Sequence, residues 1–119
     1  MSINSKTYLL GLNAEELVAQ HFKSIGFSVL ARRYKTKYGE IDLIIQKAQQ
    51  IIFVEVKARN RHVSIENLLT PKQIQRNYFA AEIFLSKNPQ YECYECRFDL
   101  IFVQNNKILN HIQNVMNDF

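Results

Sequence analysis

The sequence predicts an α/β fold in which a mixed β-sheet is flanked by helices. Apolar residues recur at helical spacing in residues 13–25 and again from residue 71. Two Ile- and Val-rich runs lie between these stretches, and apolar and polar residues alternate at 94–103. Helix and strand patterns mixed along one short chain are typical of a sheet covered by helices. With 119 residues the chain can bury one hydrophobic core but not two, so we expect a single domain over residues 1–119.

The first predicted helix spans about Asn13 to Ile25. Asn13 is a suitable N-cap, Glu16 completes a capping box, and Gly26 is a helix terminator. Apolar side chains recur at helical spacing and define one stripe: Ala14, Leu17, Val18, Phe22 and Ile25. On a helical projection Glu16 lies opposite this stripe, whereas Glu15 lies at its edge. We therefore expect Glu16 to be solvated and Glu15 to border the interior.

Strands and a second helix follow in a definable order. The segment FSVLARRY is a predicted strand, and the runs IDLII and IIFVEV behind it are joined by the polar turn KAQQ. Thr70 and Pro71 provide an N-cap and a first-turn signal for the second helix, which ends before the Asn-Pro pair at 88–89. A strand around 94–103, an Asn-Asn turn and a short strand or irregular tail complete the chain. The predicted core order is αβββαβ.

The composition is that of a folded globular protein with a basic balance. Hydrophobic residues make up 47% of the chain and charged residues 22%, which excludes a disordered segment. The net charge of +4 favours a polyanionic partner such as nucleic acid, although charge alone is a weak indicator. The N-terminal stretch lacks an apolar signal region, and no segment approaches the roughly 18 apolar residues of a membrane span. We expect a cytoplasmic protein without membrane contact.

The late strand carries both cysteines and one charged pair. The spacing Cys93-Tyr94-Glu95-Cys96 can bind zinc or carry redox chemistry when it lies in a loop. Here the surrounding CYECRFDLIFV alternates like a strand, in which residues three apart point to opposite faces, so we expect two reduced thiols. Arg97 and Asp99 share one face of the same strand. They are expected to pair with each other or with a helix, in a structural role.

Polar residues within the two apolar runs make their pairing informative. If the runs form an antiparallel hairpin centred on the KAQQ turn, every apolar residue meets an apolar partner, in the pairs Ile41–Val56, Leu43–Val54 and Ile45–Ile52 on one face and Ile44–Phe53 on the other. The same register sets Asp42 opposite Glu55 and Glu40 opposite Lys57. Two carboxylates then face each other with Cβ atoms about 5 Å apart, which destabilises the hairpin unless a cation lies between them.

Two interpretations of this acidic cluster remain open. A hard divalent cation suits carboxylate oxygens, and Mg²⁺ usually takes one or two carboxylates from the protein, which Asp42 and Glu55 would supply. Lys57 would then lie on the same face, beside the metal and its waters. In the alternative, the cluster is a structural ion-pair lattice at a sheet edge, in which Lys57 bridges Glu40 and Asp42.

Basic flanks favour the metal interpretation. RRYKTKY precedes the acidic cluster and KARNRH follows it, so that cations alternate with aromatic residues: Arg32, Arg33, Lys35, Lys37, Arg59 and Arg61 with Tyr34 and Tyr38. A metal site for phosphoryl chemistry needs such flanks to hold a polyanion, whereas a solvated charge run is the usual explanation for either stretch taken singly. Lys72 and Arg76, one turn apart at the start of the second helix, could bind phosphate or be ordinary solvated charges.

The chain resembles the PD-(D/E)XK nuclease superfamily. It has a helix with an inward Glu, then Asp42, and then Glu55-Val56-Lys57, which begins thirteen residues after Asp42. More closely, the chain resembles the YraN-like family of small restriction-endonuclease-like bacterial proteins over roughly residues 10–112. The combination of GEIDLI and FVEVK at this spacing is the most specific part of the match. Further matching residues are Gly11, Glu15, Ala19, Gly26, Phe27, Lys72, Arg97, Phe98 and Asp99.

The chain departs from the family pattern at two positions. Ala14 replaces a glycine that usually precedes the helix Glu, and Ala favours the helix. Arg33 stands where the family commonly has Asn after the second Arg at the strand entry, which bears on how a substrate strand is held. Ile41 replaces the Pro of the superfamily motif, as it does in the YraN-like family generally.

The resemblance implies a restriction-endonuclease-like fold with a metal-dependent nuclease site. By it, Asp42 and Glu55 are ligands of Mg²⁺ or Mn²⁺, with the backbone carbonyl of Val56 as a further ligand. Lys57 orients or activates the attacking water, and Glu15 completes the site. The cations expected to bind nucleic acid are Arg32, Arg33, Lys35, Lys37, Arg59, Arg61 and Lys72. The implied reaction is hydrolysis of a phosphodiester to 5′-phosphate and 3′-hydroxyl ends.

DNA is expected as the partner ahead of RNA, and the sequence leaves open whether branched or otherwise structured, single-stranded or duplex forms are preferred. The alternative is a nucleic-acid-binding module that keeps the fold without appreciable cleavage, and a third class would use the ion-pair face for protein contacts. Retention of Asp42, Glu55 and Lys57 together argues against a decayed site. The sequence leaves open whether the protein is a homodimer.

Overall fold

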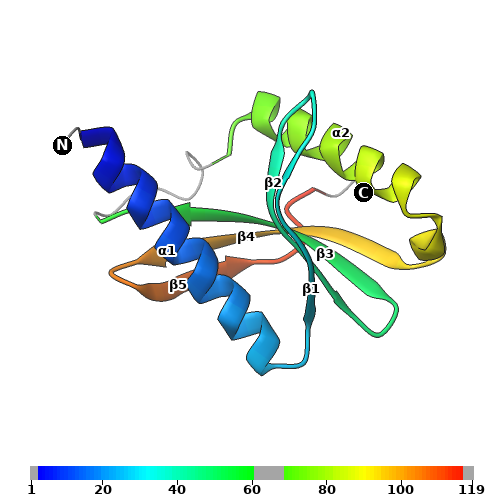
Figure 1. Ribbon diagram of the computed structural model, residues 1–119, viewed down its shortest axis with the longest axis horizontal. Coiled ribbons are helices and arrows are strands. Elements are labelled where there is room, and N and C mark those ends of the chain that lie inside the picture. The colour runs from blue at the N-terminus through cyan, green and yellow to red at the C-terminus, as the bar shows by residue number, and fades with distance from the viewer. Residues whose placement is uncertain (1–2, 61–68, 117–119) are drawn as a thin grey trace.

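The computed structural model describes residues 3–60 and 69–116, with side chains from residue 13 onward. The elements follow in the order α1 (Ile3–Ser24), β1 (Ser28–Lys35), β2 (Glu40–Lys47), β3 (Gln50–Ala58), α2 (Pro71–Lys87), the 3₁₀ turn η2 (Pro89–Tyr91), β4 (Glu95–Gln104) and β5 (Lys107–Ile112) (Figure 1). The strands form one sheet in the order β1-β2-β3-β4-β5. The predicted αβββαβ core is therefore confirmed, with a fifth strand after it.

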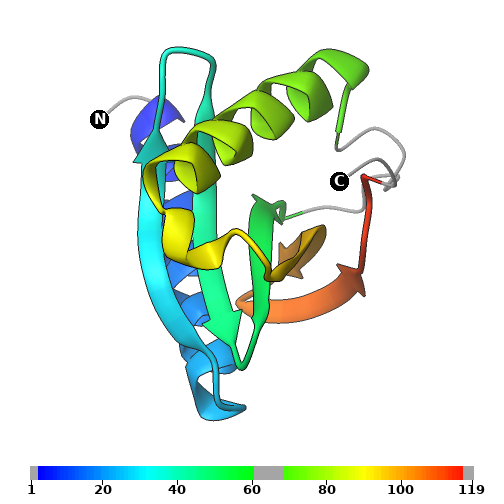
Figure 2. The same ribbon diagram turned by 90° about the vertical axis from the view of Figure 1, so that its right-hand side faces the viewer.

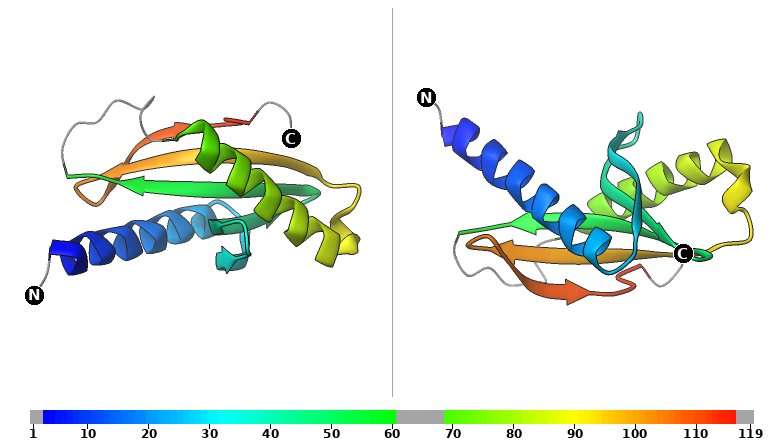
Figure 3. Two further views of the ribbon diagram at one scale, coloured as in Figure 1. Left: turned by 90° about the horizontal axis from the view of Figure 1, so that it is seen from above. Right: turned by 60° about the horizontal axis from the view of Figure 1, so that its bottom comes forward.

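The sheet is mixed, and its two faces are covered by different helices. Only β3 and β4 run parallel among neighbouring strands of the described sheet, because α2 carries the chain from one to the other as a crossover. Helix α1 covers one face and α2 the other (Figure 3). Val18 and Phe22 of α1 belong to the core on the first face, and Ala81 and Phe84 of α2 to the core on the second. This α/β arrangement is consistent with a restriction-endonuclease-like fold. In the described part of the chain, neither helix has an apolar stretch long enough to cross a bilayer.

Helix α1 begins ten residues before the predicted N-cap, so the prediction for Asn13 is wrong. The preceding Leu9, Leu10 and Leu12 favour helix, and a capping sequence does not interrupt a helix that has already begun. The predicted terminator is confirmed: Gly26 has a φ of +98°, and the Phe27 amide bonds back to the Phe22 carbonyl at 3.0 Å. The last residue of the predicted apolar stripe, at position 25, lies beyond the helix end and is 46% exposed.

The predicted hairpin register holds for its inner half only. Leu43 pairs with Val54, and the next two predicted pairs, Ile44–Phe53 and Ile45–Ile52, also form. The β2–β3 ladder ends at Leu43, so the predicted outer pairs, which would have joined residues 40–42 to residues 55–57, do not form. Ile41 instead packs on the α2 side of the sheet. Beyond this point β2 stays paired with β1 alone. The two strand ends and the turn between them, residues 33–42, form an arm that rises between α1 and α2 (Figures 1 and 2).

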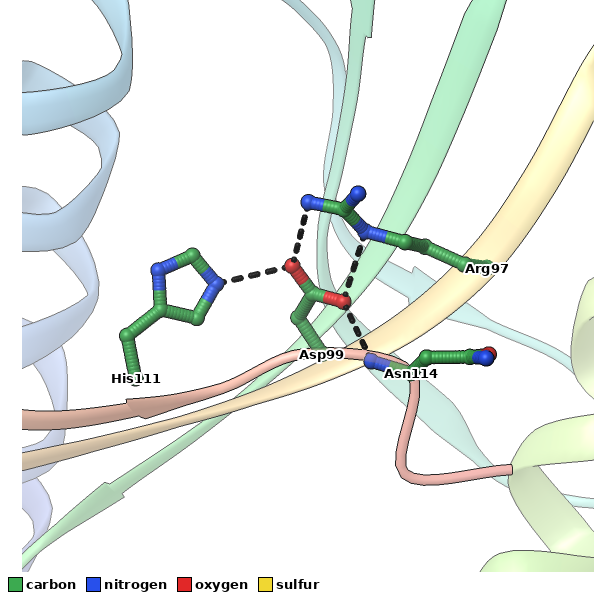
Figure 4. A network of polar contacts seen from close by, with 4 residues as sticks. All are labelled: Arg97, Asp99, His111 and Asn114. Carbon is green, nitrogen blue, oxygen red and sulfur yellow. Dashed lines mark hydrogen bonds and ion pairs between the residues drawn. The ribbon is translucent and has the colours of Figure 1, made fainter. Parts of the chain in front are cut away.

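The predicted Arg97–Asp99 pair is confirmed and belongs to a larger network (Figure 4). Asp99 is fully buried, and its Oδ1 and Oδ2 accept from the Arg97 guanidinium at 3.0 and 3.2 Å. His111 Nε2 lies 2.8 Å from Oδ2, and the Asn114 amide donates to Oδ1 at 3.0 Å. The network ties β4 to β5 and to the segment after it, which supports a structural role. Cys93 precedes β4, Cys96 lies within it, and both are free thiols.

Candidate active site

The carboxyl groups of Asp42 and Glu55 meet where β2 separates from β3. Because the ladder stops at Leu43, the Asp42 side chain replaces a main-chain partner: its Oδ2 accepts a 2.8 Å hydrogen bond from the Val56 amide. The Asp42 carboxyl group is also in hydrogen-bonding contact with that of Glu55. The structure therefore brings together the two predicted ligands, although they are not ladder partners.

Two polar side chains hold Glu55 in place. Glu55 is 6% exposed, and its Oε2 accepts a 2.9 Å hydrogen bond from Nδ2 of Asn77, a buried residue of α2. Nζ of Lys57 lies 3.6 Å from Oε1. Sequence reasoning missed Asn77, yet a signal was present, because it is a polar residue three positions after Ile74 and four before Ala81 on the inward side of α2.

Burial and proximity shift both carboxyl groups toward the neutral form. Burial is the largest cause of a rise in the pKa of Glu55 to about 8, and the charge of the neighbouring Asp42 carboxylate is the next largest. Burial also raises the pKa of Asp42, although the hydrogen bonds from Glu55 and the Val56 amide oppose the shift. Near neutral pH the pair therefore retains a proton unless another cation takes its place.

Glu15 of α1 lies near Asp42, and both side chains line one cavity. A cavity of about 250 Å³ separates α1 from the arm and is lined by Glu15, Glu16, Arg32, Arg33, Asp42 and Leu43. Burial raises the pKa of Glu15 to about 7, and the charge of Asp42 adds to that shift. Glu15 is half-buried and Glu16 is exposed, as the helical projection predicts. The four predicted catalytic residues thus gather between α1, the base of the arm and β3.

The donor set fits a hard divalent cation with few protein ligands. Among the described residues, no group of three or more His, Cys, Asp or Glu side chains is arranged to hold a metal, so Asp42 and Glu55 are the carboxylates available. One or two carboxylates, completed by water, are the usual protein contribution to Mg²⁺. A cation between the two groups would replace the proton that their contact now requires.

The predicted basic flank of β1 divides into two parts. Arg32 pairs with Glu16, and Arg33 Nε donates to Glu40 Oε1 at 3.0 Å. The predicted Glu40–Lys57 pair is therefore wrong, because Glu40 faces Arg33 across the arm and Lys57 faces Glu55. These two arginines line the cavity beside Asp42 and are engaged with acidic side chains.

Lys35 and Lys37 are exposed at the far end of the arm. Of the two predicted aromatic neighbours, Tyr34 turns inward against Phe84, whereas Tyr38 turns outward and is 43% exposed. The arm thus presents its cations and one aromatic ring on its tip.

The remaining predicted contacts lie along the edges of the site. Arg59 Nη1 donates to the Ala58 carbonyl at 2.7 Å, directly after β3. Lys72 is exposed in the first turn of α2. Arg61 falls outside the described residues.

The model of the Uncharacterised protein family UPF0102 matches residues 14–103, which include all four predicted catalytic residues. The chain belongs to this family. UPF0102 is the YraN family that the sequence motifs resemble. A UPF0102 protein of Rhodopseudomonas palustris strain BisB5 is 44% identical over 102 residues, which cover 86% of this chain and 78% of the relative.

Other UPF0102 relatives match over the same share of the chain. The UPF0102 protein of Nitrobacter winogradskyi is 38% identical and is covered over 86% of its length. UPF0102 protein bll0669 of Bradyrhizobium diazoefficiens is 35% identical and is covered over 77% of its length. The family name carries no activity, so function rests on the geometry of the site.

Proposed function

We propose that this UPF0102 member is a metal-dependent nuclease that hydrolyses phosphodiester bonds in DNA. The buried contact between the Asp42 and Glu55 carboxyl groups, with Lys57 Nζ 3.6 Å from Glu55, is the observation that carries this proposal. Two carboxyl groups packed together away from water destabilise the apo fold, and carboxyl groups with raised pKa values are frequent at catalytic sites.

Each residue of the cluster has a role that its contacts support. Asp42 and Glu55 would hold Mg²⁺ or Mn²⁺ together with the Val56 carbonyl, and Asn77 fixes the orientation of Glu55. The bound metal would supply Lewis acidity toward a phosphate oxygen and an acidified water. Lys57, on the same side of β3 as Glu55, orients the attacking water or stabilises charge on the phosphate. Glu15, with a pKa near 7, can exchange a proton at neutral pH.

A binding module without cleavage is the second candidate. It is favoured by the small donor set, since no described cluster of three or more metal-ligating side chains is present. In that case a shared proton and Lys57 would keep the carboxyl pair neutral, and the basic arm alone would bind nucleic acid.

A cleavage assay separates the two candidates. Purified protein is incubated with labelled duplex, single-stranded and junction DNA in Mg²⁺, in Mn²⁺ and in chelator. We expect metal-dependent cleavage that Glu55→Gln and Lys57→Ala abolish, whereas the control Glu92→Gln, which alters an exposed residue after η2, cleaves like wild type. Binding of the same substrates without cleavage in either metal would refute the nuclease and support the binding module.

A further inference from the structure

An exposed pair of aromatic rings joins the tip of the arm to α2. Tyr38, in the turn between β1 and β2, lies against Phe79 of α2 with ring centroids 5.2 Å apart. The two side chains remain 43% and 39% exposed. Exposed aromatic surface of this kind is not required by the core, which the inward-facing Tyr34 and Phe84 already fill on this side of the sheet.

The turn holds this ring pair in a fixed position. Thr36 Oγ1 accepts from the amides of Tyr38 and Gly39 at 3.1 and 3.2 Å, and the Thr36 amide donates to the Gly39 carbonyl at 2.8 Å. Gly39 also rests on α2, since a Cβ at this position would lie 3.3 Å from Cβ of Arg76. The arm tip is therefore braced against the helix, and the two rings form a preorganised platform.

Cations surround the two rings. Lys35, Lys37 and Lys87 line a groove of about 660 Å³ that Tyr38 also borders, and Lys37 Nζ lies 5.2 Å from the centre of the Tyr38 ring. On α2, Lys72 and Arg76 recur with Phe79 at helical spacing and so share one side of the helix.

One acidic residue interrupts this charge. Glu82 is the single acid of α2, and it projects about 60° from Phe79 around the helix axis. It is outnumbered by the five cations Lys35, Lys37, Lys72, Arg76 and Lys87. The ring pair thus lies on a surface whose charge complements a polyanion.

We propose that this surface, hereafter the arm platform (Tyr38 and Phe79 with Lys35, Lys37, Arg76 and Lys87), binds an unpaired nucleic-acid strand. Bases stack on the two rings while the phosphates lie against the cations, which is how aromatic residues interleaved with basic ones bind single strands. A blunt duplex offers the rings only the outer faces of its two terminal base pairs, because all other base faces are stacked inside the helix. The platform therefore selects substrates with a single-stranded arm or gap.

The platform and the candidate active site are carried by the same two elements, α2 and β2 with its turn. Arg76 is followed in α2 by Asn77, which bonds to Glu55, and Gly39 is followed by Glu40, the first residue of the strand that also carries Asp42. This inference rests on the proposed nuclease function for its substrate, but the binding it describes is measurable without cleavage.

Binding is measured by fluorescence anisotropy in chelator, so that no cleavage occurs. The probes are a labelled oligo-dT strand, the blunt duplex of this strand with oligo-dA, and an abasic sugar-phosphate chain of equal length. We expect the single strand to bind more tightly than the other two. Tyr38→Ala and Phe79→Ala should each weaken single-strand binding by about 5- to 100-fold and leave duplex binding unchanged.

Matched variants separate stacking from folding and from bulk charge. Phe79→Leu keeps an apolar side chain on α2 but removes the ring, and Leu109→Ala removes an exposed apolar side chain on β5, away from the platform. Phe79→Leu should weaken single-strand binding and Leu109→Ala should not. Lys35→Ala and Lys37→Ala should flatten the salt dependence of binding, whereas Lys107→Ala, an exposed residue of β5, should have little effect.

The inference is overturned if Tyr38→Ala and Phe79→Ala leave single-strand affinity unchanged, or if they weaken duplex and abasic binding equally. It is also overturned if the protein binds none of the probes and the two variants convert a dimer to a monomer in sedimentation, since the platform would then be an interface between copies. Ring-dependent single-strand binding without cleavage in Mg²⁺ or Mn²⁺ would refute the nuclease alone. Cleavage that requires Asp42, together with single-strand binding that does not require the rings, would refute the platform alone.

Discussion

Asn77 of α2 donates a 2.9 Å hydrogen bond to Glu55 of β3, and both side chains are buried. This contact links the crossover helix to the carboxyl pair, because Glu55 in turn contacts Asp42 at the base of the arm. The position of α2 therefore sets the orientation of a predicted metal ligand.

Removing this donor should damage both stability and activity. Asn77→Ala leaves Glu55 without its amide partner in a buried setting, so we expect the free energy of unfolding to fall by about 1–3 kcal/mol and cleavage to drop. Gln75→Ala, on the exposed side of α2, is the control. Denaturant melts and the cleavage assay measure the two effects. Wild-type values for Asn77→Ala in both would show that α2 does not orient Glu55.

The apo protein should become less stable as the pH rises. The pKa of Glu55 is raised from 4.5 to about 8 and that of Glu15 from 4.5 to about 7, so the folded protein holds protons that the unfolded chain has already released. Unfolding then releases protons, and stability present below about pH 4.5 is lost as the pH rises through the folded-state values.

The expected slope is at most about 1.4 kcal/mol per pH unit for each proton. Urea melts in chelator at pH values between about 4.5 and 8 measure this slope. Glu55→Gln should make the stability-against-pH profile flatter, because it removes one titrating group. A wild-type stability that rises over this range, or a Glu55→Gln profile as steep as that of wild type, would contradict the assignment.

Arg33 adopts a left-handed backbone conformation, with a φ of 52°. Residues with a Cβ are strained in this region, and among them Asn is the least strained. Both Arg33→Asn and Arg33→Ala remove the ion pair with Glu40, so their difference reports the backbone alone. We expect Arg33→Asn to be more stable than Arg33→Ala by about 1 kcal/mol in denaturant melts. Equal stabilities would show that the backbone at this position is not strained.

The inner half of the β2–β3 hairpin could be predicted from the sequence, but the arm could not. Leu43, Ile44 and Ile45 each meet an apolar partner in the observed register, whereas a slip of one residue would set Leu43 against Glu55 or Asp42 against Val54. Beyond Leu43 the path of β2 depends on its pairing with β1 and on the contact between Gly39 and Arg76. These are tertiary relations between segments far apart in the chain.

The same distinction applies to the site. The meeting of Asp42, Glu55 and Lys57 was predicted, but through a register that does not reach these residues; the Asp42 side chain instead contacts β3 where the ladder has ended. Asn77 and Phe79 belong to a helix that reaches the site only through the β3–α2–β4 crossover. Their neighbours could not be deduced from spacing within either segment.

Thermal melts of wild type and Asp42→Asn, each with and without Mg²⁺, test the metal site most directly. In a metal site, Asp42→Asn relieves the carboxyl contact while its amide oxygen still accepts from the Val56 amide, so the apo variant should be as stable as wild type or more so. Mg²⁺ should stabilise wild type and not the variant. In a structural ion-pair lattice, Asp42→Asn would instead cost about 1–3 kcal/mol. A clear loss of apo stability in Asp42→Asn, together with no Mg²⁺ stabilisation of wild type, would contradict the metal site and the nuclease with it.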